Sequence, residues 1–250
     1  MTRSERIAAW LRDRAAEARA SGFILGMSGG IDSAVVARLC QLAMPGRVLG
    51  VIMPCHSHPD DELDAMLAAE SSTLPVVRVD LAGAYDALAL DVTAVTSTER
   101  GHGFTPDAAR TKLALANIKP RLRMTTLYTI GTSLNLLVTG TGNKSEITIG
   151  YYTKYGDGGV DLLPIGALVK SEVRALAIEL GVPARIIDKP PSAGLWTGQT
   201  DESEMGFTYE ELERFIEGDA GTLAPDTVAR IERLAGASHH KRALPPIAPA

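Results

Sequence analysis

The chain alternates short, largely apolar runs with longer stretches that have helical periodicity. The apolar runs are Phe23–Met27, Val48–Met53, Val76–Val79 and Leu136–Thr139, and each has the length of a strand. Largely apolar strands are typical of parallel sheets, and the helical stretches between them supply layers that cover both faces. The pattern predicts an α/β fold: a doubly wound parallel sheet with helices on both faces, formed by residues 1–250 as a single domain.

Seven stretches carry the helical pattern. They are about the first twenty residues, Ile31–Met44, a stretch from the polar loop at 55–62 to about Ser71, Asp107–Ser133, Val169–Leu180, Tyr209–Ile216 and Asp226–Leu234. Pro120 should interrupt or kink the long helix, because proline lacks an N–H and clashes with the preceding turn. Three segments have no regular period: residues 91–106 are expected to form an irregular surface excursion, the glycine-rich residues 150–161 a mobile loop, and residues 238–250 a tail.

Composition and charge limit the kinds of binding partner and the cellular location that we expect for this protein. Lys and Arg number 25 against 30 Asp and Glu, which gives a formal charge of −5 and no excess of positive charge for binding nucleic acid. No apolar run approaches the ~20 residues that cross a bilayer, and the charged N-terminus lacks a secretory hydrophobic region. Cys40 and Cys55 form no CxxC pair, and Cys40 lies in an apolar helical run typical of a core residue. We expect a cytoplasmic protein that binds neither nucleic acid nor membrane.

The string SGGIDS at residues 28–33 joins the first predicted strand to a helix. Backbone N–H groups and the positive end of the helix converge at such a loop, which favours a phosphate or pyrophosphate. Asp32 is unusual in an anion site unless a cation binds too, and Mg²⁺ bridging phosphates explains it. The lysine of a Walker A loop and the glycine spacing of a dinucleotide-binding loop are both absent. The loop therefore predicts a nucleotide site of another kind.

The string HSHPDD at residues 56–61 is similar to a metal-binding motif of metallo-β-lactamases. It ends in Asp61 where that motif has histidine, and it follows a strand of the predicted parallel sheet. We expect a polar loop in which Pro59 opens the next helix rather than a metal site.

SGGIDS resembles the PP-loop of the ATP-pyrophosphatase superfamily, whose members adenylate a carbonyl or carboxylate oxygen and release pyrophosphate. The loop alone does not select among the superfamily's reactions, which include NAD, GMP, argininosuccinate and asparagine synthesis and tRNA thiolation. Five further strings resemble the ammonia-dependent NAD synthetase family in order and spacing: NIKPRLRM at 117–124, GTGNKSE at 140–146, YYTKYGDGGVDLLPI at 151–165, KPPSAGLWTGQTDE at 189–202 and HKR at 240–242. The resemblance covers nearly the whole chain and is weakest over residues 55–75 and 86–105.

The resemblance implies a ligase that adenylates the nicotinate carboxylate of deamido-NAD with ATP and Mg²⁺. Ammonia then displaces AMP to give NAD. The family pattern assigns catalysis to Asp32, Glu146 and Lys170, and the metal to Asp32 and Glu146. It assigns ATP contacts to Gly26, Met27, Ser28, Gly29, Gly30, Ile31, Asp32, Ser33, Thr141, Lys170 and Ser192, and deamido-NAD contacts to Arg121, Lys154, Asp161, His240 and Lys241.

The resemblance also implies a homodimer, for which residues 107–133 are our candidate contact. Lys154 lies in the glycine-rich segment, which we expect to close over the substrate and keep water from the adenylate. We expect free ammonia as the nitrogen donor, because 250 residues leave no room for a glutaminase domain; a separate glutaminase subunit stays open. Two alternatives remain: another PP-loop enzyme, GMP-synthetase-like or tRNA-thiolating, and a non-catalytic nucleotide-binding protein on the same scaffold.

Overall fold

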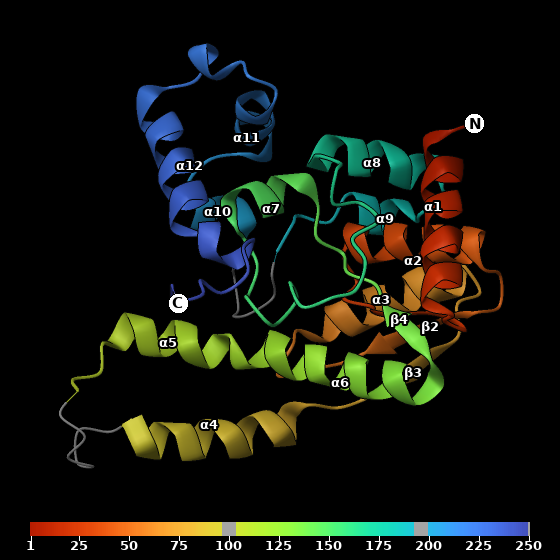
Figure 1. Cartoon of the computed structure of the whole chain (residues 1–250), viewed down its shortest axis with the longest axis horizontal. Coiled ribbons are helices and arrows are strands. Elements are labelled where there is room, and N and C mark those ends of the chain that lie inside the picture. The colour runs from red at the N-terminus through yellow and green to blue at the C-terminus, as the bar shows by residue number, and fades with distance from the viewer. Residues whose placement is uncertain (97–103, 193–199, 250) are drawn as a thin grey trace.

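A four-stranded parallel sheet lies at the centre of the structure, a computed structural model that describes residues 1–96, 104–192 and 200–249 (Figure 1). Its strand order is β3-β2-β1-β4, and all four predicted strands are present. The order runs one way from β1 to β3 and reverses at β4, so the switch point lies between β1 and β4. The bounds are β1 Gly22–Gly26, β2 Val48–Ile52, β3 Val76–Arg78 and β4 Leu136–Val138.

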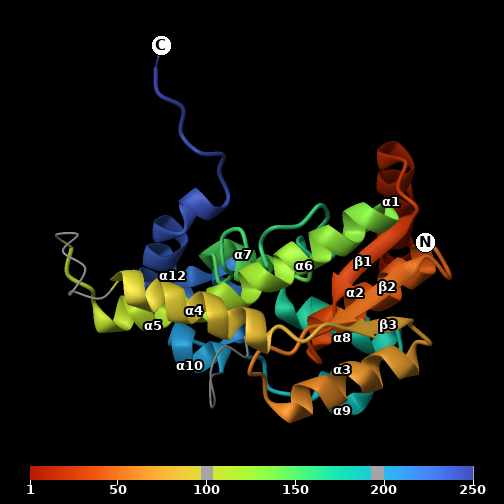
Figure 2. The same ribbon diagram turned by 90° about the horizontal axis from the view of Figure 1, so that it is seen from below.

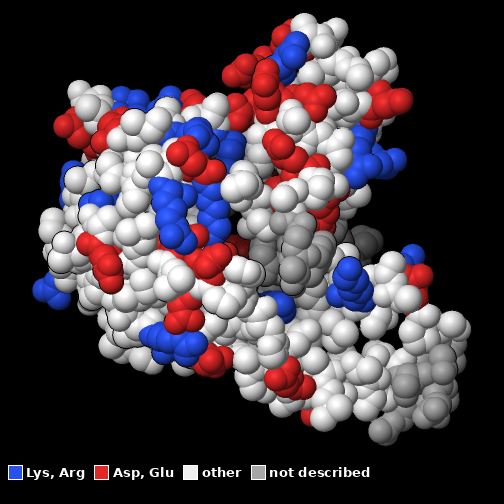
Figure 3. Space-filling model, turned by 180° about the vertical axis from the view of Figure 1, so that it is seen from behind, with Lys and Arg blue, Asp and Glu red and all other residues white. Residues whose placement is uncertain are grey.

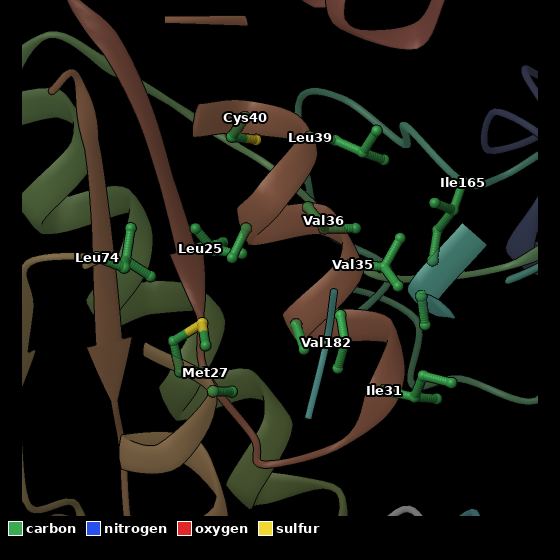
Figure 4. Packing of buried hydrophobic residues seen from close by; sticks show 14 of the residues in the cluster. Leu25, Met27, Ile31, Val35, Val36, Leu39, Cys40, Leu74, Ile165 and Val182 are labelled. Atoms are coloured by element: carbon green, nitrogen blue, oxygen red, sulfur yellow. The ribbon is translucent and has the colours of Figure 1, made fainter. Parts of the chain in front are cut away.

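Helices cover both faces of the sheet, as predicted. Side chains of β1 alternate between the faces: Leu25 packs with Val35 and Val36 (Figure 4), whereas Ile24 packs with Leu127 on the other side. Cys40 is buried in the first of these cores, as predicted. On that face lie α1 (Arg3–Ala18), α2 (Ile31–Ala43), α3 (Pro59–Ser71), α8 (Lys170–Glu179) and α9 (Ala184–Ile187); on the other lie α4 (Ala82–Thr96) and α6 (Ile118–Leu134).

Helix α4 corrects the expectation for residues 91–106. The chain is helical as far as Thr96, so residues 91–96 are not irregular, while residues 97–103 lie outside the described residues. The prediction was wrong because no residue of α4 is buried. A helix without a buried face lacks the apolar–polar periodicity by which helices are recognised in a sequence. Figure 2 shows α4 running beside α5 (Ala108–Ala116) and α6.

The predicted interruption near Pro120 is confirmed, but it falls just before the proline. Asn117 separates α5 from α6, and Pro120 occupies the first turn of α6. A first-turn N–H has no acceptor within its helix, so proline loses nothing there.

A second cluster of helices packs on the C-terminal side of the molecule, away from the sheet (Figure 1). The helices are α7 (Lys144–Ile149), α10 (Asp201–Met205), α11 (Tyr209–Ile216) and α12 (Pro225–Ala237), of which α11 and α12 were predicted. Their shared core consists of Ile149, Met205, Phe207, Tyr209, Leu212 and Ile231. We call this group the C-terminal cluster.

The surface carries mixed charge. On the face shown in Figure 3, Lys and Arg side chains are interspersed with Asp and Glu. Among the described residues, no helix has both the length and the apolar character needed to cross a membrane.

Candidate active site

The predicted phosphate loop, residues 26–33, lies at the carboxyl edge of the sheet beside the switch point between β1 and β4. Ligands of doubly wound sheets bind at this place. Gly30 precedes α2 and contributes no side-chain cap, which leaves the helix start suited to an anion. The Ser33 hydroxyl donates to the Gly30 carbonyl at 2.9 Å, and the Ser28 hydroxyl accepts from the Gly30 N–H at 3.2 Å. The two serines therefore shape the loop.

Gly29 allows helix α3 to pack directly against the phosphate loop. Its φ is +79°, and an added Cβ would lie 2.5 Å from the Asp61 carbonyl oxygen and 2.9 Å from the Cβ of Asp64. Only glycine fits this backbone conformation and this contact without displacing α3.

Asp32, Glu146 and Lys170 converge beside the loop, although they come from three helices. The ammonium nitrogen of Lys170 lies 2.5 Å from Oδ2 of Asp32 and 3.7 Å from Oε1 of Glu146. Each residue belongs to the first turn of its helix: α2, α7 and α8. Asn143 holds both carboxylates, because its side-chain amide donates to Asp32 at 3.1 Å and its backbone N–H donates to the carboxylate of Glu146 at 3.2 Å. Its side-chain oxygen also caps α7 by accepting the N–H of Glu146 at 3.0 Å.

Burial and mutual charge shift the protonation of these groups. Burial and the carboxylate of Asp32 raise the pKa of Glu146, and Lys170 opposes that rise. Burial alone would lower the pKa of Lys170, but the carboxylates of Asp32 and Glu146 outweigh it and raise the pKa. Lys170 therefore stays charged at neutral pH.

The two carboxylates fit a magnesium ion. One oxygen of Asp32 and one of Glu146 lie within 4 Å of a single point, the Lys170 ammonium, so both face a shared cation position. Carboxylate oxygens are the donors that Mg²⁺ prefers, and it commonly takes one or two of them together with substrate phosphates. Within the described residues no group of three or more His, Cys, Asp or Glu could hold a metal. Two carboxylates suit an ion that takes its other ligands from phosphates and water.

The remaining predicted ATP residues lie in two different settings. Thr141 is half-buried in the turn between β4 and α7, at the same edge as the phosphate loop. Ser192 is exposed at the end of the described range 104–192, after α9. The string at 189–202 to which it belongs falls partly on residues 193–199, outside the described residues.

Arg121, Lys154 and His240, three of the residues predicted to bind deamido-NAD, lie together. The guanidinium of Arg121 donates to the Lys154 carbonyl at 3.4 Å, and the ammonium of Lys154 donates to the His240 carbonyl at 2.6 Å. Segments from α6, the 150–161 loop and the tail thus meet at one point.

Lys241 links the tail to the 150–161 loop. Its ammonium donates to the carbonyls of Gly150 and Tyr152, each at 2.6 Å. The Thr153 N–H donates to the carboxylate of Asp157 at 2.8 Å, so the loop is folded into hydrogen-bonded turns. That this loop is mobile stays a prediction.

Asp161 makes different contacts from the other predicted substrate residues. One carboxylate oxygen accepts the hydroxyl of Tyr128 at 2.9 Å, and the other accepts the N–H of Val138 at 2.8 Å. Asp161 therefore links β4 to α6.

Sequence reasoning missed several polar residues at the site. Arg123 is among them, and it donates to the Met53 carbonyl at 3.2 Å and to the Ser57 hydroxyl at 3.1 Å. These contacts hold the loop after β2 in place. Asn143 could have been found from its capping-box spacing to Glu146, whereas nothing local to Arg123 or Tyr209 distinguishes them from ordinary helix residues.

The histidine string after β2 has structural contacts. His58 caps α3, since its Nδ1 accepts the N–H of Asp60 at 3.2 Å, and Pro59 opens that helix as predicted. His56 bonds to Asp86 of α4 at 2.7 Å. The string therefore ties the loop to α3 and α4.

Comparison with known proteins places the chain in a family. The sequence profile of the NAD synthase family matches residues 3–245. The NH(3)-dependent NAD(+) synthetase of Carboxydothermus hydrogenoformans is 50% identical over 98% of this chain and 96% of its own length, and that of Archaeoglobus fulgidus is 44% identical over 98% and 95%.

Solved structures agree with this match. The NMN synthetase of Francisella tularensis has a TM-score of 0.88 at 37% identity and covers 98% of this chain and 97% of its own. The NH3-dependent NAD synthetase of Campylobacter jejuni has a TM-score of 0.78 at 29% identity and covers 99% and 97%. The chain therefore belongs to the NAD synthase family.

Proposed function

We propose that this protein is an ammonia-dependent NAD synthetase, a ligase that converts deamido-NAD to NAD with ATP. The observation that carries the proposal is the convergence of Asp32, Glu146 and Lys170 on one point beside the phosphate loop. That geometry serves cleavage of ATP, and the family match supplies the substrate class. The match also favours this function over a GMP-synthetase-like, tRNA-thiolating or non-catalytic one.

The reaction needs ATP because a carboxylate has no leaving group that ammonia can displace. A carboxylate oxygen of the nicotinate attacks the α-phosphorus of ATP, and the bond to the bridging oxygen of pyrophosphate breaks. Ammonia then attacks the carbonyl carbon, AMP leaves and the added nitrogen loses a proton. Both steps develop negative charge on phosphate oxygens, which the start of α2 and the Lys170 ammonium are placed to stabilise.

We assign the predicted site residues to three ligands: ATP, Mg²⁺ and deamido-NAD. Residues 26–33 hold the phosphates, with Lys170, Thr141 and Ser192 as further ATP contacts. Asp32 and Glu146 hold Mg²⁺, which neutralises phosphate charge when bound. Arg121, Lys154, Asp161, His240 and Lys241 bind deamido-NAD. Lys154 and the 150–161 loop close over the adenylate and exclude water.

A second acid substrate has support from one solved relative. The Francisella tularensis protein is named an NMN synthetase. NMN is the nicotinamide nucleotide without the AMP half of NAD, so nicotinate mononucleotide can undergo the same two steps. Our proposal is that deamido-NAD is preferred, because the curated relatives are NAD synthetases.

The test offers both acids to the purified protein with ATP, MgCl₂ and ammonium chloride. We expect NAD, AMP and pyrophosphate in equal amounts, a higher kcat/KM for deamido-NAD, and no product when glutamine replaces ammonium. An Asp32→Asn variant controls for contaminating activity. A higher kcat/KM for nicotinate mononucleotide would replace the proposed substrate, and absence of AMP with either acid would refute the enzyme function.

We further propose a cytoplasmic homodimer in which residues 1–250 act as one domain. The two free cysteines fit a reducing compartment. Apolar side chains of α4 and α5 are exposed in the isolated chain, with Leu90 72%, Val95 60% and Leu113 49% exposed. These helices and the outer side of α6 form the proposed contact, which extends the predicted 107–133 surface to α4.

Sedimentation velocity tests the dimer. Leu90→Lys should convert the parental dimer to a monomer, because it places a charge in the apolar contact. Ile178→Lys, at an α8 residue that is 65% exposed, is the matched control and should stay dimeric. A monomeric parent protein would contradict the proposal.

A further inference from the structure

Lys170 has a neighbour that the reaction described above does not use. Its ammonium nitrogen lies 5.2 Å from the centre of the Tyr209 ring, on the first residue of α11. An ammonium over an aromatic face is attracted by the ring, most strongly where water is excluded. Tyr209 is 6% exposed, so the contact is buried. Lys170 is therefore held between two carboxylates and an aromatic ring.

Tyr209 also contacts a further carboxylate, that of Asp201. The Tyr209 hydroxyl donates to Oδ2 of Asp201 at 2.8 Å, and Asp201 is 4% exposed. The other oxygen of Asp201 has no partner of normal hydrogen-bond geometry in the described part of the chain. Burial raises the pKa of the Asp201 carboxyl group, and the hydrogen bond from Tyr209, the charge of Lys170 and Tyr151 oppose that rise. Lys170 and Tyr209 therefore both favour the charged form of Asp201.

The position of this pair is fixed by the C-terminal cluster. Tyr209 packs in the apolar core of the cluster with Phe207 and Leu212, and its N–H donates to Glu202 at 3.0 Å. The ring cannot turn away from Lys170 without opening that core. The cluster thus reaches the site through Tyr209.

A metal ion held by Asp32 and Glu146 would compete with the Lys170 ammonium for these carboxylates and would repel it. Asp201 and Tyr209 belong to α10 and α11, which carry neither of the two carboxylates. They would therefore still attract the Lys170 ammonium beside the phosphates.

We infer that Tyr209 and Asp201 are positioning residues that hold the Lys170 ammonium at the ATP phosphates while Asp32 and Glu146 bind the metal. This inference rests on the proposed function, in which Lys170 contacts ATP. It means that the C-terminal cluster contributes to ATP binding through Tyr209 and Asp201.

The test compares variants at Tyr209 with a matched loss of an aromatic ring elsewhere in the cluster. Tyr209→Leu removes the ring, Tyr209→Phe keeps it and removes the hydroxyl, and Phe207→Leu shortens a side chain in the same core that is not in contact with Lys170. We expect Tyr209→Leu to raise both KM and the calorimetric Kd for ATP about tenfold, as loss of a buried cation–π contact predicts. Tyr209→Phe should stay within about threefold of the parent, and Phe207→Leu should lower Tm without changing the Kd for ATP.

Asp201→Asn tests the carboxylate and also covers a Tyr209→Leu protein that does not fold. It keeps the acceptor for Tyr209 and removes the charge, and we expect a several-fold rise in the Kd for ATP, measured with Mg²⁺. A Kd for ATP equal to the parent's in Asp201→Asn, or equal in Tyr209→Leu and Phe207→Leu, would overturn the inference. A parent that binds ATP but forms no NAD would refute the proposed function instead, and the calorimetric comparison would still decide the role of Tyr209.

Discussion

The ammonium of Lys170 bonds to the carboxylate of Asp32 at 2.5 Å, although the two residues are 138 positions apart in the chain. Both side chains are largely buried. A buried charge is stable only with a partner, so each residue depends on the other before any ligand binds. The pair also places the Lys170 ammonium where negative charge on the phosphates is expected to develop.

Replacement of Lys170 by Met should therefore lower kcat/KM for NAD formation by about 10²- to 10³-fold, the usual loss when a charge-stabilising donor is removed. Steady-state kinetics measure this loss, and thermal unfolding checks the fold. Lys144→Met, at an exposed first residue of α7, is the control and should stay near the parent. Equal activity of the two variants would show that the Lys170 charge is not used.

Asp64 anchors a second ion-pair group next to the phosphate loop, and its replacement should affect stability. Its carboxylate bonds to Arg185 at 2.6 Å and to Lys189 at 2.7 Å. Burial would raise the pKa of Asp64, but the hydrogen bonds from Lys189 and Arg185 outweigh it and lower the pKa. Asp64→Asn should destabilise the protein by roughly 1–2 kcal/mol at pH 7, because the buried Asp64 side chain loses its charge-assisted hydrogen bonds, whereas Arg185 is exposed and Lys189 keeps its ion pair with Asp61.

The lowered pKa also sets the pH dependence. The Asp64 ion pairs stabilise the fold at pH values above the unfolded pKa of about 3.9, and their contribution is lost as the pH falls through the lower folded pKa. Urea unfolding from pH 7 to pH 3 should show a smaller loss of stability in Asp64→Asn than in the parent. Glu70→Gln, on the exposed side of the same helix, should follow the parent curve. Parallel curves for Asp64→Asn and the parent would contradict the assignment.

Lys241 should control the order of the 150–161 loop, because its ammonium bonds to two carbonyls of that loop. In Lys241→Met we expect amide hydrogen exchange in residues 150–157 to rise about tenfold, which corresponds to about 1.4 kcal/mol, the size of one or two lost hydrogen bonds. Arg233→Met, an exposed basic residue of α12, is the matched control. Unchanged exchange in Lys241→Met would mean that the loop is held by its internal turns alone.

Much of the sheet could be predicted from sequence, whereas contacts between distant segments could not. The strands are visible because runs such as Val48–Met53 are apolar on both faces. Helix α4 was missed because none of its own residues is buried, so that its sequence lacks a periodic apolar face. Only the structure shows that α4 extends as far as Thr96.

The site shows the same division. The phosphate loop follows from local chemistry, since glycines, a helix start and Asp32 lie within one short string. The pairing of Lys170 with Asp32 depends on how α8 packs beside α2, and the contact of Tyr209 with Lys170 depends on the C-terminal cluster. No local pattern encodes either distance. The family resemblance named Lys170 in advance and did not name Tyr209 or Asp201.

Oxygen transfer tests the central claim, adenylation of a carboxylate, most directly. Deamido-NAD labelled with ¹⁸O in both nicotinate carboxylate oxygens is converted with ATP, Mg²⁺ and ammonium, and AMP, pyrophosphate and NAD are analysed by mass spectrometry. The account predicts one ¹⁸O in each AMP, one in the carboxamide of each NAD and none in pyrophosphate. ¹⁸O in inorganic phosphate or pyrophosphate, or AMP without label, would contradict it.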